Sequence, residues 1–190
     1  MKNIAIFASG SGSNFEAIAE QINNGNINCN LSLLVVNKKD AYVIERAKKY
    51  NVETLVLTLK EMKTKEAYEQ VIVDKLKELN IDYIFLAGYM LYCGKVLLDN
   101  YEGKIINIHP ALLPSFKGAH GILDAYNYGV KVYGVTVHYV DSGVDSGKII
   151  DQEAFYDEGF SFEEIESKIH EIEHRLYPRV VKRFVEGVYE

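Results

Sequence analysis

Blocks of consecutive apolar residues alternate along this chain with segments in which apolar residues recur every three or four positions. The apolar run KNIAIFA (2–8) is followed by NFEAIAEQINNG (14–25), which has helical spacing and ends at a glycine. The same order recurs twice more, in 31–37 with 41–51 and in 54–59 with 65–80. This alternation predicts strands that are each followed by a helix.

The second half of the chain continues with apolar runs but changes their pattern. IDYIFLAG (81–88) and GKIINIH (103–109) are typical of further buried strands, whereas VYGVTVHYV (132–140) alternates and GKIIDQEAFY (147–156) resembles a strand. A final helix is predicted over 161–187, where a Ser-x-x-Glu capping box opens it.

Repeated strand–helix units predict an α/β fold, in which an open, mostly parallel twisted sheet carries helices on both faces. The strands after residue 130 are expected to add differently directed neighbours to that sheet. With 190 residues and no repeat, low-complexity tract or convincing linker, the chain is expected to form one domain. A chain of this length buries roughly 70% of its unfolded surface, enough for a rigid catalytic scaffold.

Composition narrows the classes of function. A formal net charge of −6 argues against broad nucleic-acid binding, which needs a basic face, and favours a small ligand. No apolar run has the length of a membrane span and no signal-peptide pattern opens the chain, so a cytoplasmic protein is expected. Cys29 and Cys93 are too few for a disulfide framework and are expected to be buried thiols.

The first chemical candidate is the glycine-rich loop ASGSGSNF (8–15) between the first strand and the first helix. Phe15 and Asn37 stand where a dinucleotide fingerprint wants a third glycine and an acidic residue, and no Gly-Lys-Ser/Thr of a Walker loop is present. A single phosphate, bound by the amides near Gly12, Ser13 and Asn14, is therefore favoured. A tight turn in which Ser13 or Asn14 merely caps the helix remains the alternative.

The second candidate is KIINIHPALLPSF (104–116), which ends a predicted strand on Asn107 and His109. Their two-residue spacing puts both side chains on one face, beyond the carboxyl end of a strand where ligands collect in open sheets. An amide and an imidazole could then converge on one reacting atom, and Pro110 and Pro114 would limit backbone freedom there. A turn hydrogen bond from Asn107 is the competing interpretation.

A carboxylate near His109 would favour its protonated form and give an acid able to donate to a developing oxyanion. Asp145, in the glycine-rich segment YVDSGVDSGK (139–148), is the first candidate, and Asp141 competes for the role on these grounds. Asp145 could equally serve a β-turn.

Two other histidine patterns are weaker. HEIEH (170–174) matches the H-E-x-x-H zinc pattern, but the sequence shows no clear third ligand, and Glu186 is the remaining candidate. A solvated helix face explains the pattern more simply. His138 is interpreted as a hydrogen-bonded structural residue.

The ordered set SGSGSN, LAGYM, NIHPALLPSF, GVTVHYVDSGVDSG and EHRLYP resembles the phosphoribosylglycinamide formyltransferases, a folate-dependent family of purine synthesis, over nearly the whole chain. The resemblance implies one Rossmann-like formyltransferase domain over 1–190, with a phosphate-binding part at about 1–100 and a catalytic and folate-binding part at about 101–190. It implies transfer of a formyl group from the cosubstrate 10-formyltetrahydrofolate to the amine of 5′-phosphoribosylglycinamide, with no metal. The expected partners are these small molecules, without nucleic acid or membrane, and a homodimer is left open.

Carried onto matching positions, the resemblance implies a set of site residues. They are the catalytic residues Asn107, His109 and Asp145; Gly12, Ser13 and Asn14 at the phosphate; Glu173 at the ribose; and Lys65, Met90, Leu91, Tyr92, Cys93, Asn107, Val140, Asp141, Ser142, Gly143, Val144 and Asp145 at the folate.

Lys65 and Leu91 depart from the family pattern, since a member of the family has arginine at both positions. The polar contacts that those arginines would make to folate are therefore expected to be weakened or replaced in this chain. Three rival functions are carried: a formyltetrahydrofolate hydrolase, which uses the same three residues with water as acceptor; a methionyl-tRNA formyltransferase, which needs a basic surface; and a non-catalytic folate or phosphosugar sensor.

Overall fold

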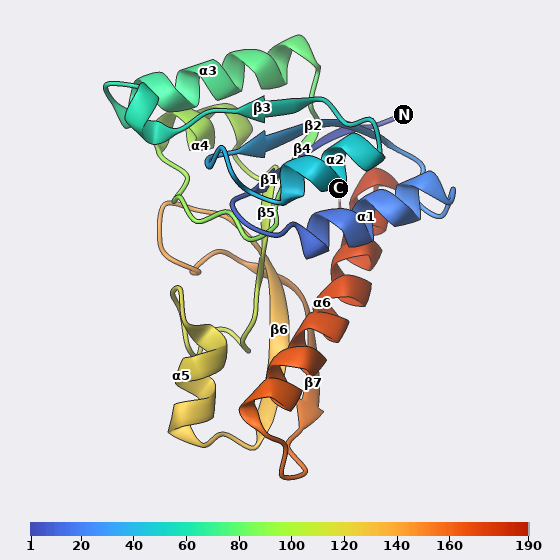
Figure 1. The fold of residues 1–190 in the computed structure, drawn as a ribbon, viewed down its shortest axis with the longest axis vertical. Coiled ribbons are helices and arrows are strands. Elements are labelled where there is room, and N and C mark those ends of the chain that lie inside the picture. The colour runs from blue at the N-terminus through green and yellow to red at the C-terminus, as the bar shows by residue number, and fades with distance from the viewer. Residues whose placement is uncertain (190) are drawn as a thin grey trace.

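A computed structural model describes residues 1–189 and contains one seven-stranded sheet (Figure 1). The strands follow one another across the sheet in the order β3-β2-β1-β4-β5-β6-β7. Their bounds are β1 Asn3–Ala8, β2 Asn30–Val36, β3 Thr54–Val56, β4 Tyr83–Leu86, β5 Ile105–His109, β6 Val132–Tyr139 and β7 Ile149–Tyr156. The first five are parallel, and β6 and β7 run antiparallel to their neighbours, so the predicted change of strand direction is confirmed.

Six α-helices connect or follow these strands. Their bounds are α1 Ser13–Asn23, α2 Val43–Lys49, α3 Lys65–Glu78, α4 Lys95–Tyr101, α5 Gly121–Tyr128 and α6 Phe162–Val185. Ser161 and Glu164 form the predicted capping box at the start of α6. The predicted strand at 54–59 is shorter, because Thr58 caps a 3₁₀ turn, Leu59–Glu61, instead of continuing β3.

Helices cover both faces of the sheet, as predicted. Successive residues of β1 belong to different apolar clusters: Ile4 and Ile6 pack with α1, α2 and α6, whereas Ala5 and Phe7 pack with α3 and α4. A strand buried on both faces needs apolar residues at every position, which explains the continuous run at 2–8. Figure 1 shows α3 and α4 on the far side of the sheet from α1 and α6.

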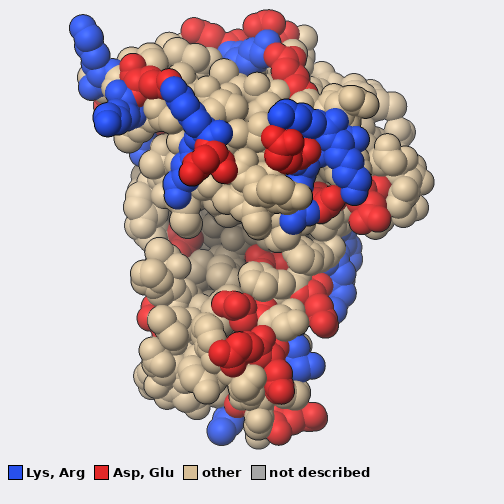
Figure 2. Space-filling model, in the orientation of Figure 1, with Lys and Arg blue, Asp and Glu red and all other residues tan. Residues whose placement is uncertain are grey.

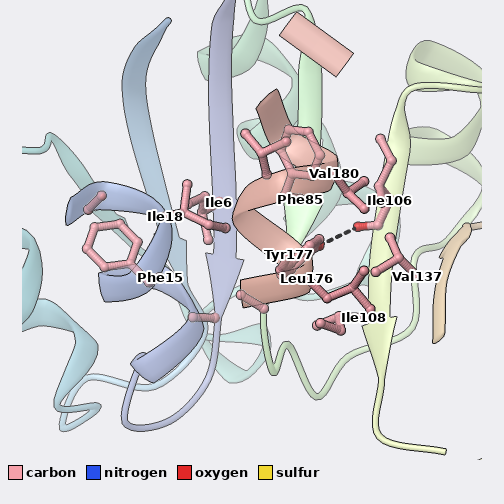
Figure 3. Close-up of a cluster of buried hydrophobic side chains, with 14 of the residues drawn as sticks. Ile6, Phe15, Ile18, Phe85, Ile106, Ile108, Val137, Leu176, Tyr177 and Val180 are labelled. Carbon is pink, nitrogen blue, oxygen red and sulfur yellow. Dashed lines mark hydrogen bonds between the residues drawn. The ribbon is translucent and has the colours of Figure 1, made fainter. Parts of the chain in front are cut away.

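Helix α6 is the long connecting element of the structure, because it packs against α1 at one end and against β6 and β7 further down (Figure 1). Figure 3 shows its buried side chains Leu176, Tyr177 and Val180 among residues of the central strands. The Tyr177 hydroxyl donates to the carbonyl oxygens of Leu86 at 2.7 Å and Ile106 at 3.1 Å. These bonds tie α6 to the last residue of β4 and to the second residue of β5, two strands whose carboxyl ends border the site.

The β6–β7 hairpin extends the sheet beyond the parallel strands, with α5 beside it in Figure 1. Register places Asn107 of β5 opposite His138 of β6, and His109 opposite Thr136. The pairing thereby brings His138 and Thr136 of β6 beside Asn107 and His109 of β5. Among residues 1–189, no helix combines the length and apolarity needed to cross a bilayer.

Candidate active site

A cleft of about 550 Å³ opens at the carboxyl ends of β1, β4 and β5. Figure 2 shows the hollow between an upper part that mixes basic and acidic residues and a lower part where acidic residues predominate. Every predicted site residue except Lys65 lines it. The segments that form most of its wall are 10–14, 86–93, 107–110 and 140–146. The predicted residues other than Lys65 therefore surround one cleft.

The predicted phosphate loop, residues 10–14, turns sharply at Gly12. Its φ is 79°, and a Cβ on it would lie 2.3 Å from Val43 Cγ2, so this position requires glycine. Gly12 is also the N-cap of α1, and no side chain caps that helix. The alternative in which Ser13 or Asn14 merely caps α1 is therefore wrong. The first turn of a helix presents free amides and a positive dipole end, which suits a phosphate.

Asn14 instead reaches across to α6. Its Nδ2 donates to Glu173 Oε2 at 3.0 Å, and the other carboxylate oxygen lies 2.7 Å from His170 Nδ1. The hydrogen bond to Glu173 raises the pKa of His170, against the opposing effect of desolvation. Glu173 is only 6% exposed, so the interpretation of a wholly solvated face at HEIEH is wrong at this residue. The carboxylate lines the cleft because α6 packs against α1, the helix that follows the predicted phosphate loop.

Asn107 and His109 both line the cleft, as their spacing predicts. Asn107 Nδ2 lies 3.2 Å from His138 Nε2, and His138 Nδ1 lies 2.8 Å from the Tyr139 carbonyl oxygen. Nδ1 therefore carries the proton and Nε2 accepts from Asn107. Burial lowers the pKa of His138, in agreement with this neutral form. One Asn107 N–H is thus fixed by His138, and the second remains for a ligand.

His109 is 4% exposed and has acceptors at both ring nitrogens. Its Nε2 donates to the Phe116 carbonyl oxygen at 2.7 Å, whereas Nδ1 lies 3.5 Å from Asp145 Oδ2. The Asp145 carboxylate also accepts from the Gly118 amide at 2.8 Å and lies 3.7 Å from His138 Nε2. Asp145 therefore faces His109 Nδ1, the ring nitrogen not committed to a close hydrogen bond. His138 Nε2 already accepts from Asn107 and has no proton for the carboxylate.

Asp141, the competing carboxylate, has a different environment. Its Oδ1 accepts from the Ser146 hydroxyl at 2.7 Å and from the Gly143 amide at 2.9 Å. These bonds lower the pKa of Asp141, the Ser146 bond most of all. Asp141 therefore organises the loop, and Asp145 is the carboxylate beside His109.

Two residues beside the ring nitrogens of His109 have left-handed backbone conformations. Phe116 has φ 55° and Asp145 has φ 48°, values that cost free energy for side chains other than glycine. Such outliers concentrate at functional sites, where surrounding contacts hold them. Here the strained residues supply the carbonyl that fixes His109 Nε2 and the carboxylate that faces His109 Nδ1.

The predicted folate segment, 90–93, crosses the other side of the cleft. Met90 N donates to Ser9 Oγ at 2.8 Å, and the preceding Tyr89 ring packs edge-on against Phe7. Met90 and Tyr92 are exposed, which leaves apolar surface for a flat ligand. Lys65 stands apart from the cleft because its ammonium group donates to the Tyr92 carbonyl oxygen.

A buried carboxylate braces the same segment from behind. Glu69 of α3 is 3% exposed, and its two oxygens accept from the amides of Gly94 at 2.6 Å and Leu97 at 3.2 Å. Together with Lys65 and the Tyr68–Tyr89 hydroxyl pair at 3.1 Å, it joins one face of α3 to residues 89–97. Sequence reasoning missed Glu69, because its partners Gly94 and Leu97 are distant in sequence. His138 is hydrogen-bonded, as predicted.

The remaining chemical candidates are a metal site and the two cysteines, and neither is supported as a functional site. Among residues 1–189, no group of three or more His, Cys, Asp and Glu side chains is arranged to hold a metal ion. Burial raises the pKa of Cys29 to about 11 and that of Cys93 to about 12, so neither is a reactive thiolate at neutral pH. Cys29 is buried as predicted, and Cys93 is partly buried.

Residues 2–181 match the formyl transferase family, and the chain belongs to that family. A full-length relative is the phosphoribosylglycinamide formyltransferase of Bacillus subtilis (strain 168), 47% identical over 97% of this chain and 95% of that protein. The crystal structure of phosphoribosylglycinamide formyltransferase from Bacillus halodurans, also 47% identical, superposes with a TM-score of 0.94 over 98% of this chain and 97% of the other.

A third relative sets the chain in a larger context. The trifunctional purine biosynthetic protein adenosine-3 of Chironomus tentans is 34% identical over 98% of this chain, which spans 14% of that protein. The predicted fold, family and phosphoribosylglycinamide formyltransferase activity are confirmed by these similarities. A formyl-folate cosubstrate follows from the family.

Proposed function

We propose that this protein transfers the formyl group of 10-formyltetrahydrofolate to the amine of 5′-phosphoribosylglycinamide, with Asn107, His109 and Asp145 as the catalytic set. The observation that carries the proposal is the convergence, on one cleft, of an anion-binding helix N-terminus and an amide–imidazole–carboxylate cluster. A phosphorylated amine can lie with its phosphate at residues 12–14 and its amine toward Asn107.

In the proposed reaction, the glycinamide nitrogen attacks the formyl carbon and a tetrahedral intermediate forms. Asn107 donates its second Nδ2 proton to the oxyanion, and protonated His109 donates from Nδ1, while the Phe116 carbonyl anchors its other nitrogen. Loss of one such oxyanion donor costs about 3–4 kcal/mol in comparable sites. The charge of Asp145, 3.5 Å away, stabilises the imidazolium.

The intermediate collapses when the bond between the formyl carbon and N10 of the folate breaks. The attacking nitrogen loses a proton and N10 gains one, so tetrahydrofolate and formylglycinamide ribonucleotide leave. Asp145 assists a water in carrying this proton. General acid–base assistance of this kind typically contributes about 10²–10⁴-fold to the rate. Fixing both substrates in line contributes further, because their encounter entropy is lost on binding.

The binding roles extend this proposal to the rest of the cleft. Glu173, already bonded to Asn14 and His170, accepts from the ribose hydroxyls. The folate lies against 90–93 and the loop 140–145. The phosphate part thus falls within about 1–100 and the catalytic part within about 101–190, and a cytoplasmic setting suits both substrates.

The test measures formyl transfer from 10-formyltetrahydrofolate with three acceptors: phosphoribosylglycinamide, its dephosphorylated form, and water. Rapid product formation only with the phosphorylated amine supports the proposal. Equal folate breakdown with all three would establish a hydrolase instead. Folate binding without turnover would establish a sensor.

A further inference from the structure

Arg46 lies behind the phosphate loop and joins it to two helices. Its Nε donates to the Ser11 carbonyl oxygen at 2.8 Å, and its guanidinium group pairs with Glu16 in the first turn of α1. The guanidinium carbon also lies 5.0 Å from the centre of the Tyr42 ring. With its side chain only 24% exposed, Arg46 is fixed on several sides.

A second bond from α2 acts on the neighbouring peptide group. The Val43 amide donates to the Gly10 carbonyl oxygen at 3.1 Å. Carbonyl oxygens 10 and 11 are therefore both held toward α2. In a trans peptide the N–H points opposite to the C=O, so the amides of Ser11 and Gly12 are turned away from α2. The cleft lies on the side away from α2, because Gly12 backs onto Val43 and the loop lines the cleft.

Without the Arg46 bond, the Ser11 peptide could rotate and present its carbonyl oxygen to the cleft. An oxygen carries partial negative charge and repels a phosphate, whereas an amide attracts it. The contact from Arg46 to Ser11 therefore selects the loop conformation that can bind an anion.

Substitution of Lys49 separates the effect of the Arg46–Ser11 hydrogen bond from the effect of a positive charge near the loop. Its ammonium group lies 3.1 Å from Glu16 Oε1, so Lys49 and Arg46 neutralise the same carboxylate beside the loop. Only the Arg46 side chain, of these two, is bonded to the loop backbone. Removing Lys49 thus deletes one positive charge near the loop and leaves the Ser11 contact in place.

We propose that Arg46 is a positioning residue for the acceptor's phosphate, acting through the Ser11 carbonyl. The inference rests on the proposed function, since it assigns the phosphate monoester of the acceptor to residues 12–14. It predicts that loss of Arg46 impairs catalysis only when the acceptor carries a phosphate.

The experiment compares wild type with Arg46→Met, Arg46→Lys and the control Lys49→Met, using phosphoribosylglycinamide and its dephosphorylated form. Arg46→Met should raise KM for the phosphorylated acceptor about 10-fold, as loss of one charge-assisted hydrogen bond does. Its kcat, its KM for the formyl donor and its kcat/KM with the dephosphorylated acceptor should stay near wild type. Lys49→Met should change KM for the phosphorylated acceptor less than twofold.

Arg46→Lys keeps the charge and replaces Arg46→Met in the test if the methionine variant folds poorly. It should show the same phosphate-specific rise in KM, because lysine lacks the Nε–H that reaches Ser11. Equal losses with both acceptors would overturn the inference, as would a Lys49→Met effect as large as that of Arg46→Met. A wild-type enzyme that does not distinguish the two acceptors would overturn the proposed function itself, and this inference with it.

Discussion

His109 Nδ1 and Asp145 Oδ2 lie 3.5 Å apart at the base of the cleft, although one ends β5 and the other lies in the loop that follows β6. The Gly118 amide, 2.8 Å from the same carboxylate oxygen, fixes the pair from a third segment. A carboxylate can only accept, so the pairing stabilises the form of His109 whose Nδ1 carries a proton. The proposed oxyanion donor depends on that form.

Asp145→Asn should lower kcat about 10²–10⁴-fold with little change in the unfolding midpoint, because the amide keeps the size of the carboxylate but not its charge. Steady-state formyl transfer and denaturant unfolding check this. Asp151→Asn is the matched control and should keep wild-type kcat, because it removes a partly buried carboxylate of β7 that pairs with Arg179 of α6. Equal effects of the two substitutions would contradict the role of Asp145.

Gly12→Ala should destabilise the protein by more than Gly25→Ala. Both glycines have φ 79°, so each substitution costs about 1–2 kcal/mol of backbone strain. Only at Gly12 would the new Cβ meet Val43, whereas nothing lies within 4 Å at Gly25. Urea unfolding of the two variants measures the difference. Equal destabilisation would show that the loop shifts without cost.

His170 should make stability depend on pH through Glu173. Its pKa is raised in the folded protein, so its contribution is present below the unfolded value of about 6.5 and is lost as pH rises through the folded value. His170→Gln should therefore lower the free energy of unfolding more at about pH 5.5 than at about pH 8.5. The effect should be modest, because the His170 side chain is half exposed. A larger loss at the higher pH would refute this account.

Glu69→Gln should raise KM for the formyl donor severalfold and leave KM for the amine acceptor unchanged. Glutamine offers one oxygen, so its NH₂ group confronts one of the two amides that Glu69 now satisfies, at a cost of about 1–3 kcal/mol. Gln70→Met changes the neighbouring exposed residue as a control. The two KM values separate local positioning from general damage, which would raise both together.

The strands were predictable because β1, β4, the second half of β2 and the start of β5 are buried on both faces and therefore have consecutive apolar residues. Helices α4 and α5 were not predicted. Both are short, and no side chain caps either N-terminus from its own N-cap position. For α4, the amides of Gly94 and Leu97 are satisfied by Glu69, a long-range partner that leaves no local signal.

The position of the residues that line the cleft was predictable where a motif carries its own geometry, as in the loop 10–14 and the Asn107–His109 pair. It was not predictable where partners meet through the fold. His138 reaches Asn107 only because β5 and β6 pair antiparallel in that register. The family resemblance named Asp145, but the residues alone left Asp141 open, since both carboxylates lie in the same glycine-rich segment and only the loop conformation separates them.

The most direct test of the catalytic account is the single-turnover rate constant of formyl transfer by Asn107→Ala, with folding verified by circular dichroism and both substrates saturating. The account predicts a fall of about 10²–10³-fold, the loss expected for one oxyanion donor. A folded Asn107→Ala protein that transfers the formyl group at the wild-type rate would contradict it.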